Sequence, residues 1–162
     1  MEYMMHVSPA GRKMIEDFEG CRLTAYQDIV GIWTIGYGCT GEPVHQGLTI
    51  TQQQADDMLS NRLAQEFEPK VMAEIGNVPT TQGQFDAMVS LAFNIGTGRI
   101  EHGQGEGGFD GSSVARFHKA GEYDKAADAF LLWDKAGGQV VDALDRRRAE
   151  EGQVYLDASP TS

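Results

Sequence analysis

Apolar residues recur at helical spacing near the start of the chain. Ser8 followed by Pro9 is typical of a helix N-cap and the first helical position. The apolar positions behind them repeat with the period of a helix: Met14, Ile15 and Phe18. Gly20 then favours termination. The first predicted element is therefore a short amphipathic helix that ends near residue 20.

The pattern then changes from helical spacing to strand-forming residues. Leu23–Tyr37 is rich in β-branched and aromatic residues and is interrupted by the turn-forming residues Asp28 and Gly31. Glycine and proline become frequent over 36–43, which predicts that the strands end there in a loop. This stretch therefore predicts two or three short strands arranged as a hairpin.

A long helix is predicted after the hairpin, from about residue 51 to 75. Thr51 and Gln54 have the spacing of a capping box, in which each side chain bonds the backbone N–H of the other residue. The apolar positions that follow keep the helical period: Ala55, Met58, Leu59, Leu63, Phe67 and Val71. Pro69 predicts a kink, because proline lacks the N–H that an inner helical turn uses. Such a helix would join an N-terminal lobe to a C-terminal lobe.

Further helical patterns fill the rest of the chain. One helix is predicted to be buried over much of its surface and to end at Gly96, since apolar residues occupy most of its faces: Phe85, Met88, Val89, Ala92 and Phe93. Three more helical stretches are predicted at about 113–120, 122–135 and 142–156. The last of them carries three consecutive basic residues: Arg146, Arg147 and Arg148.

A glycine-rich stretch separates the buried helix from the helices that follow. Residues 96–113 contain seven glycines and no apolar period, which predicts a mobile loop. The acidic residues and the histidine of this stretch raise a metal site as an alternative: Glu101, His102, Glu106 and Asp110. Their order matches no known ligand motif, so a solvated loop is the favoured interpretation.

Composition narrows the classes of partner. Hydrophobic residues make up 41% of the 162 residues, which is ordinary for one globular domain, and the formal net charge is −11. Such an excess of acidic residues argues against nucleic acid as the partner. No apolar run approaches the roughly 20 residues that span a bilayer, so stable membrane insertion is not expected. The N-terminus shows no signal peptide, which predicts either synthesis in the cytoplasm without an export signal or a mature form whose export segment was removed.

The two cysteines, Cys21 and Cys39, flank the predicted hairpin. They are too few for a zinc site without histidine partners. A disulfide is geometrically conceivable in an oxidising compartment. Two buried free thiols are the favoured alternative.

Three residues around the hairpin stand out as candidate chemistry: Glu19, Asp28 and Thr34. Glycosidic hydrolysis uses two carboxyl groups across the sugar, one as a proton donor and one that supports attack from the far side. Taken singly, each residue has a simpler explanation. Glu19 can be a solvated charge, Asp28 a turn residue and Thr34 an ordinary strand residue. Together, at a helix-to-hairpin junction, they favour an enzyme that cuts polysaccharide.

The segment FEGCRLTAYQDIVGIWTIGYGCT resembles the catalytic segment of phage-type lysozymes, the endolysins of glycoside hydrolase family 24. Other stretches are similar to further parts of the same family: LTITQQQADDML, QFDAMVSLAFNIGTG, AGEYDKAADAFLLWDKAGG and LDRRRAEE. The resemblance covers roughly residues 8–156. It implies a single α+β lysozyme-like domain over 1–162, with a small hairpin lobe at about 18–50, an inter-lobe helix at about 51–75 and a helical lobe at about 76–156.

The resemblance also implies roles for the three candidates. Glu19 would be the general acid that protonates the glycosidic oxygen, Asp28 would stabilise the positive charge at the sugar carbon, and Thr34 would hold the attacking water. The family inverts configuration, so the carboxyl groups of Glu19 and Asp28 are expected roughly 6.5–9.5 Å apart. An arginine of 146–148 is expected to approach Glu19, with the choice among the three open. Cys39 stands where the family usually has a structural histidine.

The implied activity is hydrolysis of the β-1,4 bond between N-acetylmuramic acid and N-acetylglucosamine in peptidoglycan. No metal or organic cofactor is expected, because carboxyl groups and water suffice. A monomer is expected, and access to the cell wall or periplasm would need a separate holin-like protein that permeabilises the membrane. Two alternatives stay open: a non-catalytic wall-binding or structural module with the same fold, and a glycosidase that cleaves chitin.

Overall fold

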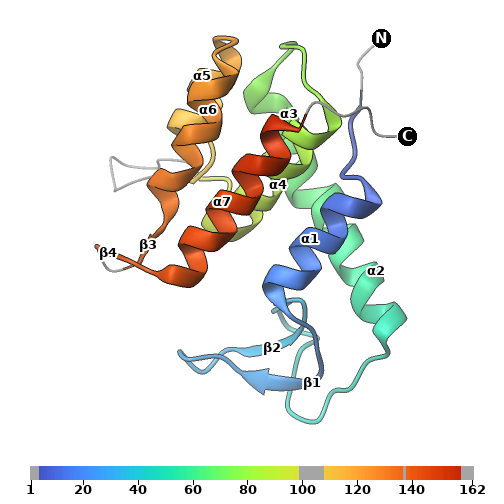
Figure 1. Cartoon of the computed structure of the whole chain (residues 1–162). Helices are drawn as coiled ribbons and strands as arrows, with labels where there is room; N and C mark the ends of the chain where they lie inside the picture. The colour runs from blue at the N-terminus through green and yellow to red at the C-terminus, as the bar shows by residue number, and fades with distance from the viewer. Residues whose placement is uncertain (1–3, 99–107, 137, 158–162) are drawn as a thin grey trace.

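The computed structural model describes residues 4–98, 108–136 and 138–157. This part of the chain is mostly helical and contains two small antiparallel pairs of strands (Figure 1). The larger pair lies at the C-terminal end of the first helix, at one end of the molecule in Figure 1. The predicted α+β fold class, with a small hairpin and a mainly helical remainder, is therefore confirmed.

Helix α1 spans Pro9–Glu19 and has the boundaries that its sequence predicts. The Ser8 side chain accepts a hydrogen bond from the backbone N–H of Gly11, and Pro9 occupies the first turn. Gly20 follows with a φ of 70°, a left-handed conformation that glycine adopts without a steric penalty. The helix therefore ends directly after Glu19, which places that carboxyl group at the junction with the hairpin.

Strands β1 (Arg22–Gln27) and β2 (Trp33–Gly36) form the predicted antiparallel hairpin. The register pairs Tyr26 with Thr34 and Gln27 with Trp33. An isolated bridge between Thr24 and Thr49 holds the following loop along the outer edge of β1. The turn that joins the strands spans residues 28–32, so Asp28 begins it and Thr34 lies just beyond it.

The predicted long helix is present as three consecutive segments: α2 (Gln52–Arg62), a π-helical turn (Leu63–Phe67) and α3 (Glu68–Ile75). The capping box between Thr51 and Gln54 is formed as predicted. The irregularity that Pro69 predicts appears as the wider π turn directly before it. A proline ring crowds the carbonyl group four residues earlier, which here belongs to Gln65 inside that turn.

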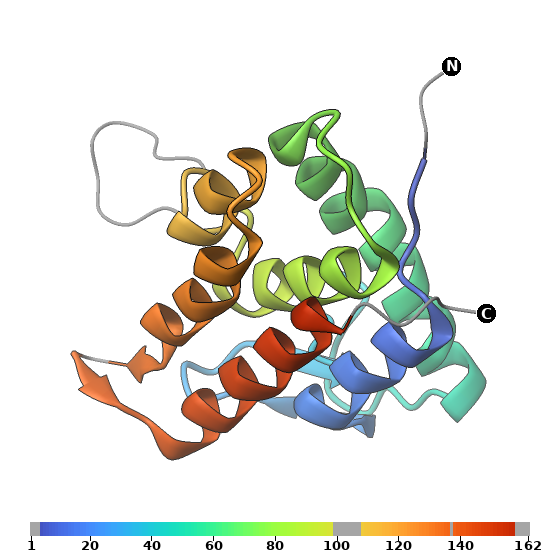
Figure 2. The same cartoon turned by 45° about the horizontal axis from the view of Figure 1, so that its top comes forward.

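Helix α4 (Gln82–Ile95) lies at the centre of the helical region, between α7 and the α2–α3 helix (Figure 2). It begins at a second capping box, formed by Thr81 and Gln84, and ends at Gly96. The remaining elements follow in chain order: α5 (Ser113–Lys119), α6 (Tyr123–Ala129), a 3-10 turn (Phe130–Trp133), β3 (Lys135–Ala136), β4 (Gln139–Val140) and α7 (Asp142–Leu156). The bounds of α7 match the prediction.

Three local features differ from the prediction. The helix predicted at about 122–135 is shorter, since α6 ends at Ala129 and the 3-10 turn and β3 follow it. The β3–β4 hairpin was not expected, because two-residue strands leave no periodic signal in a sequence. In the glycine-rich stretch, Phe109 is fully buried, and its N–H donates to the Gly96 carbonyl at 2.9 Å. The interpretation of 96–113 as a solvated loop is therefore wrong for the part around Phe109, because a core aromatic residue anchors it. The part at 99–107 lies outside the described residues.

The buried apolar residues form two clusters. The larger one surrounds α4 and takes side chains from every helix of the described chain. The smaller one lies under the β1–β2 hairpin and its following loop, and its fully buried members are Ile35, Cys39 and Val44. Met58 and Ile50 pack against the smaller cluster, so α2 contacts the hairpin through Met58. The C-terminal end of α1, at Glu19, lies between the two clusters, and the candidate site is there.

Candidate active site

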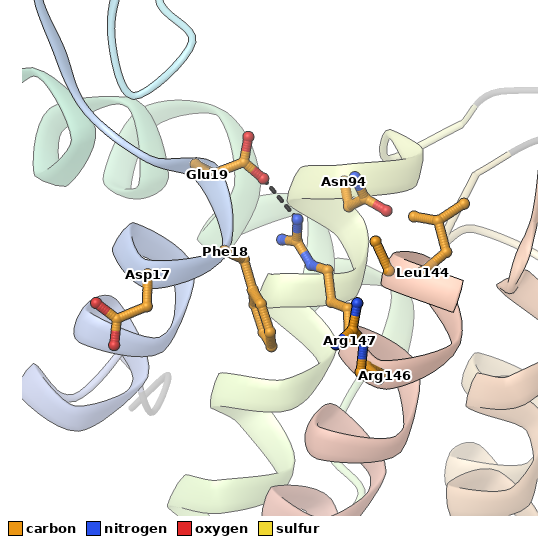
Figure 3. Close-up of a pocket in the computed structure, with 8 residues that line it drawn as sticks. Asp17, Phe18, Glu19, Asn94, Leu144, Arg146 and Arg147 are labelled. Atoms are coloured by element: carbon orange, nitrogen blue, oxygen red, sulfur yellow. Dashed lines mark hydrogen bonds and ion pairs between the residues drawn. The ribbon is translucent and has the colours of Figure 1, made fainter. Parts of the chain in front are cut away.

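Glu19 is held in place by an ion pair at the end of α1. Its Oε2 lies 2.6 Å from Nη1 of Arg147, which comes from α7 (Figure 3). The Glu19 side chain keeps 22% of its surface exposed, whereas that of Arg147 keeps 7%. Among the three consecutive arginines, therefore, the structure selects Arg147 as the one that contacts Glu19.

The geometry of α7 explains this selection. Successive residues of a helix point about 100° apart, so only part of a basic run can face the protein interior. Arg147 and Arg148 are buried and Arg146 is exposed. The guanidinium of Arg147 also stacks over the ring of Phe18, 4.7 Å from its centroid. Phe18 thus packs against the arginine that pairs with Glu19.

A pocket of about 460 Å³ opens beside the ion pair. It lies between the end of α1, the last turn of α4 and the first turns of α7, and Figure 3 shows the side chains around it. Its lining residues are Asp17, Phe18, Glu19, Asn94, Ala143, Leu144, Arg146 and Arg147. The pocket therefore combines one apolar ring with carboxyl, amide and guanidinium groups, a set that suits a polar, hydroxyl-rich ligand.

Asp28 organises the turn of the β1–β2 hairpin. Its Oδ1 accepts hydrogen bonds from the N–H groups of Val30 and Ile32, both at 2.9 Å. The residue is half-buried, and its own N–H donates to the Ile32 carbonyl. Asp28 is thus a turn residue, as the simpler explanation predicts. Both of these side-chain hydrogen bonds use Oδ1.

Thr34 lies in β2 with 4% of its surface exposed. Its hydroxyl donates to the carbonyl of Ile32 at 2.9 Å. Asp28 and Thr34 are therefore brought together by the hairpin, because the side chain of Asp28 accepts from the Ile32 N–H and the side chain of Thr34 donates to the Ile32 carbonyl. Glu19 faces the chain just beyond β2: a Cβ placed on Gly38 would lie 3.9 Å from Glu19 Oε1. Glu19 thus lies against the segment that follows β2, and Asp28 and Thr34 lie together at the turn between β1 and β2.

A buried polar network behind Glu19 was not foreseen from the sequence. Glu151 of α7 is fully buried and contacts both Arg147 and Arg148. Ser90 of α4 donates its hydroxyl to Glu151, and Arg148 donates to the amide oxygen of Asn94. The spacing of Arg147, Arg148 and Glu151 is the available signal, because residues three and four apart share a helix face. Which of two helix faces is buried cannot be read from that spacing.

Both cysteines are free thiols, which agrees with the favoured prediction. Cys39 is buried and Cys21 is half-buried, so the expectation that both are buried holds only for Cys39. Burial raises the pKa of the Cys39 thiol, and the nearby guanidinium of Arg62 opposes this effect. Cys39 therefore behaves as a small apolar residue of the hairpin core.

Within the described ranges, no group of three or more His, Cys, Asp or Glu side chains has an arrangement that suits a metal ion. Of the loop residues considered for such a site, Glu101, His102 and Glu106 lie outside these ranges. The described helices also include none that is both long and apolar enough to cross a membrane.

A helix that ends in a fixed glutamate, packed against a two-stranded hairpin and followed by a helical lobe, defines a lysozyme-like protein. The family model described as phage lysozyme matches residues 16–151. A crystal structure of a P22 lysozyme mutant superposes with a TM-score of 0.79 at 39% identity, covering 95% of this chain and 100% of that one. The chain belongs to the phage lysozyme family, whose members are glycoside hydrolases.

The chain covers very different shares of two relatives. The endolysin of Salmonella phage P22 is 40% identical over 151 residues, which cover 91% of this chain and 96% of that protein. The endolysin of Bacillus phage B103 is 37% identical over 154 residues, which cover 94% of this chain but 54% of that protein. The chain therefore spans about half the length of the second relative and nearly all of the first.

Proposed function

We propose that this protein is an endolysin-type muramidase that hydrolyses the β-1,4 bond between N-acetylmuramic acid and N-acetylglucosamine in peptidoglycan. The observation that carries the proposal is the fixed position of Glu19, between a polar pocket and the hairpin that bears Asp28 and Thr34. The match to the phage lysozyme family supports the same reaction class.

Glu19 is proposed as the general acid, and its two carboxyl oxygens have different roles. Oε2 is held by Arg147, whereas Oε1 has no hydrogen-bond partner among the described residues. Oε1 is therefore the atom placed to carry a proton to the glycosidic oxygen. Loss of that proton leaves a carboxylate, which the Arg147 guanidinium stabilises as the bond breaks. Arg147 thus stabilises the negative charge that develops on Glu19.

Asp28 and Thr34 are proposed to serve the opposite face of the sugar. Oδ2 of Asp28 would stabilise positive charge at the sugar carbon, while Oδ1 keeps the turn in place. The Thr34 hydroxyl would exchange its bond to Ile32 for one to the attacking water. An inverting reaction needs room for this water, so we expect roughly 6.5–9.5 Å between the carboxyl groups of Glu19 and Asp28.

The lobe boundaries expected from the sequence, about 18–50 and 76–156, are proposed to flank the substrate. The separate apolar cluster under the hairpin supports a small lobe with its own core. We also propose that the protein acts as a monomer and reaches the cell wall with the help of a holin-like membrane protein.

Replacing Glu19 tests the assignment. Glu19→Gln keeps the size of the side chain and one oxygen for Arg147 but removes the ionisable proton. We expect normal folding and a fall in peptidoglycan hydrolysis of at least about 1000-fold. Glu16→Gln, on the same helix and outside the pocket lining, is the control with unchanged activity. Clearing of purified cell walls by Glu19→Gln at a normal rate would contradict the catalytic role.

Digestion of purified peptidoglycan and chitin side by side separates the alternatives. A muramidase releases disaccharide–peptide fragments from peptidoglycan, identified by mass spectrometry. A chitinase shortens the chitin chains, and a wall-binding module changes neither polymer. The anomeric configuration of the first product, followed by NMR, tests inversion.

A further inference from the structure

We infer that Glu151 and Ser90, which lie outside the pocket, are positioning residues that hold Arg147 against Glu19. This inference rests on the proposed function, since it assigns them a role in the reaction of Glu19. It goes beyond Glu19, Asp28 and Thr34, because neither Glu151 nor Ser90 lines the pocket or belongs to the segment around the hairpin.

The Arg147 guanidinium is fixed on every side. Its Nη1 donates to Glu19, its Nη2 to the Ser90 carbonyl at 3.3 Å and its Nε to Glu151 Oε2 at 3.3 Å. The ring of Phe18 covers its flat face. A guanidinium offers its donors in a rigid planar fork, so fixing three nitrogens sets the position of the whole group. Glu151 supplies the only charged acceptor on the side away from Glu19 in the described chain.

Glu151 itself is held by three donors. Its Oε2 accepts from the Ser90 hydroxyl as well as from Arg147, and its Oε1 accepts from Arg148 Nη1 at 2.7 Å. All three of these partners are buried. The carboxylate is therefore locked in place, and its position determines where the Nε side of Arg147 lies.

The network returns to the pocket through Arg148. Nη2 of this arginine donates to the amide oxygen of Asn94, which lines the pocket at the end of α4. Glu19 and Asn94, two residues of one pocket, are thus connected through Arg147, which also lines the pocket, and through Glu151 and Arg148, which do not. The connected groups span α1, α4 and α7, so the relative positions of these helices and of Glu19 are coupled.

Stability alone is a poor reason for such a network. Removing two arginines and a glutamate from water carries a large desolvation penalty, and well-packed apolar residues are often at least as stabilising. A fixed guanidinium beside the proton donor has a chemical use, because charge develops on Glu19 during the reaction. A general acid also requires accurate placement, which this network provides.

Ser90→Ala is the sharpest test because it removes one hydroxyl and changes no charge. Tyr155→Phe is the matched control: it also removes one hydroxyl from a buried hydrogen bond of α7, here to His118, in a network that does not contact Glu19. We expect both variants to lower Tm by similar amounts. Only Ser90→Ala should reduce kcat on purified peptidoglycan, by about tenfold with KM unchanged.

Two further measurements distinguish positioning from a structural role. A looser Arg147 stabilises ionised Glu19 less, so the alkaline limb of the rate profile should move to higher pH in Ser90→Ala alone. The NMR signal of the Arg147 Nε–H, which requires no activity, should exchange with water about tenfold faster in this variant.

The outcomes separate this inference from the proposed function. Unchanged kcat, pH profile and Arg147 exchange in Ser90→Ala, with Glu19→Gln inactive, would overturn the positioning role and leave the muramidase assignment intact. Faster Arg147 exchange in Ser90→Ala, with Glu19→Gln fully active, would support the positioning of Arg147 and refute the catalytic role of Glu19. Equal losses of kcat in Ser90→Ala and Tyr155→Phe would also overturn the inference, because general destabilisation would explain both.

Discussion

Asp28 has two separable tasks at the tip of the β1–β2 hairpin. One oxygen accepts two backbone N–H groups and shapes the turn, and the proposed chemistry needs the negative charge of the carboxylate. An amide retains an acceptor oxygen of the same shape but carries no charge. Substitution by asparagine therefore separates the turn from the chemistry, whereas alanine removes both.

We expect Asp28→Asn to keep the turn and to change the free energy of unfolding by less than about 1 kcal/mol. Its activity on peptidoglycan should fall by at least about 100-fold, because the charge that stabilises the sugar cation is lost. Asp28→Ala should lose both activity and about 1–2 kcal/mol of stability. Thermal unfolding and turnover measured on both variants provide the check. Full activity in Asp28→Asn would leave only the turn role.

Among elements, the connection between α4 and α5 shows how a glycine-rich sequence can form packed structure. Phe109 occupies the larger core, and the N–H groups of Phe109 and Asp110 bond the carbonyls of Gly96 and Thr97. A Cβ on Gly108 would lie 1.9 Å from the Gly96 carbonyl oxygen. Gly108 is therefore required for the close approach of two backbone segments.

Gly108→Ala should separate these segments and destabilise the fold by more than about 2 kcal/mol. Gly152→Ala is the contrasting variant, since a Cβ there would meet the Ala127 carbonyl oxygen at 3.4 Å and alanine favours the middle of α7. We expect Gly152→Ala to change stability by less than about 1 kcal/mol. Urea unfolding of both variants tests the contrast, and equal effects would show that the Gly108 contact is relaxed in solution.

Most elements were predictable because their signals are local. Ser8 and Pro9 at α1, and Thr51 with Gln54 at α2, act through backbone groups within a few residues, so their consequences appear in the sequence itself. Pro69 predicted an irregularity in the long helix but not its form as a π turn, and the β3–β4 hairpin was missed. The first depends on how the helix accommodates the proline, and the second is too short to show a period.

For the whole molecule, a buried histidine links stability to pH. His118 is fully buried, and its ring nitrogens contact the Tyr155 hydroxyl at 2.6 Å and the Thr80 hydroxyl at 2.8 Å. Burial lowers the pKa of His118 to about 4 from its usual value of 6.5. The folded state thus binds this proton less readily than the unfolded chain does.

The sign of the effect follows from that difference. Between about pH 4 and 6.5 the unfolded chain binds more protons, so stability is complete above pH 6.5 and falls as the pH is lowered through this window. The loss amounts to about 3 kcal/mol. In His118→Gln this dependence should disappear, flattening the unfolding free energy against pH by up to about 1.4 kcal/mol per unit. Identical slopes for both proteins would exclude His118 as the cause.

The sequence by itself determined the boundaries of α1 and α7, the hairpin and the three candidate residues around it. Those features arise from backbone propensities, caps and spacing over short distances. Tertiary structure decided which arginine meets Glu19, that Phe109 is a core residue, and that Glu151 and Ser90 lie behind the ion pair. The arginine that meets Glu19 and the residues behind the ion pair depend on how α7 packs against α1 and α4, because that packing determines which side of α7 is withdrawn from water. No local pattern encodes it.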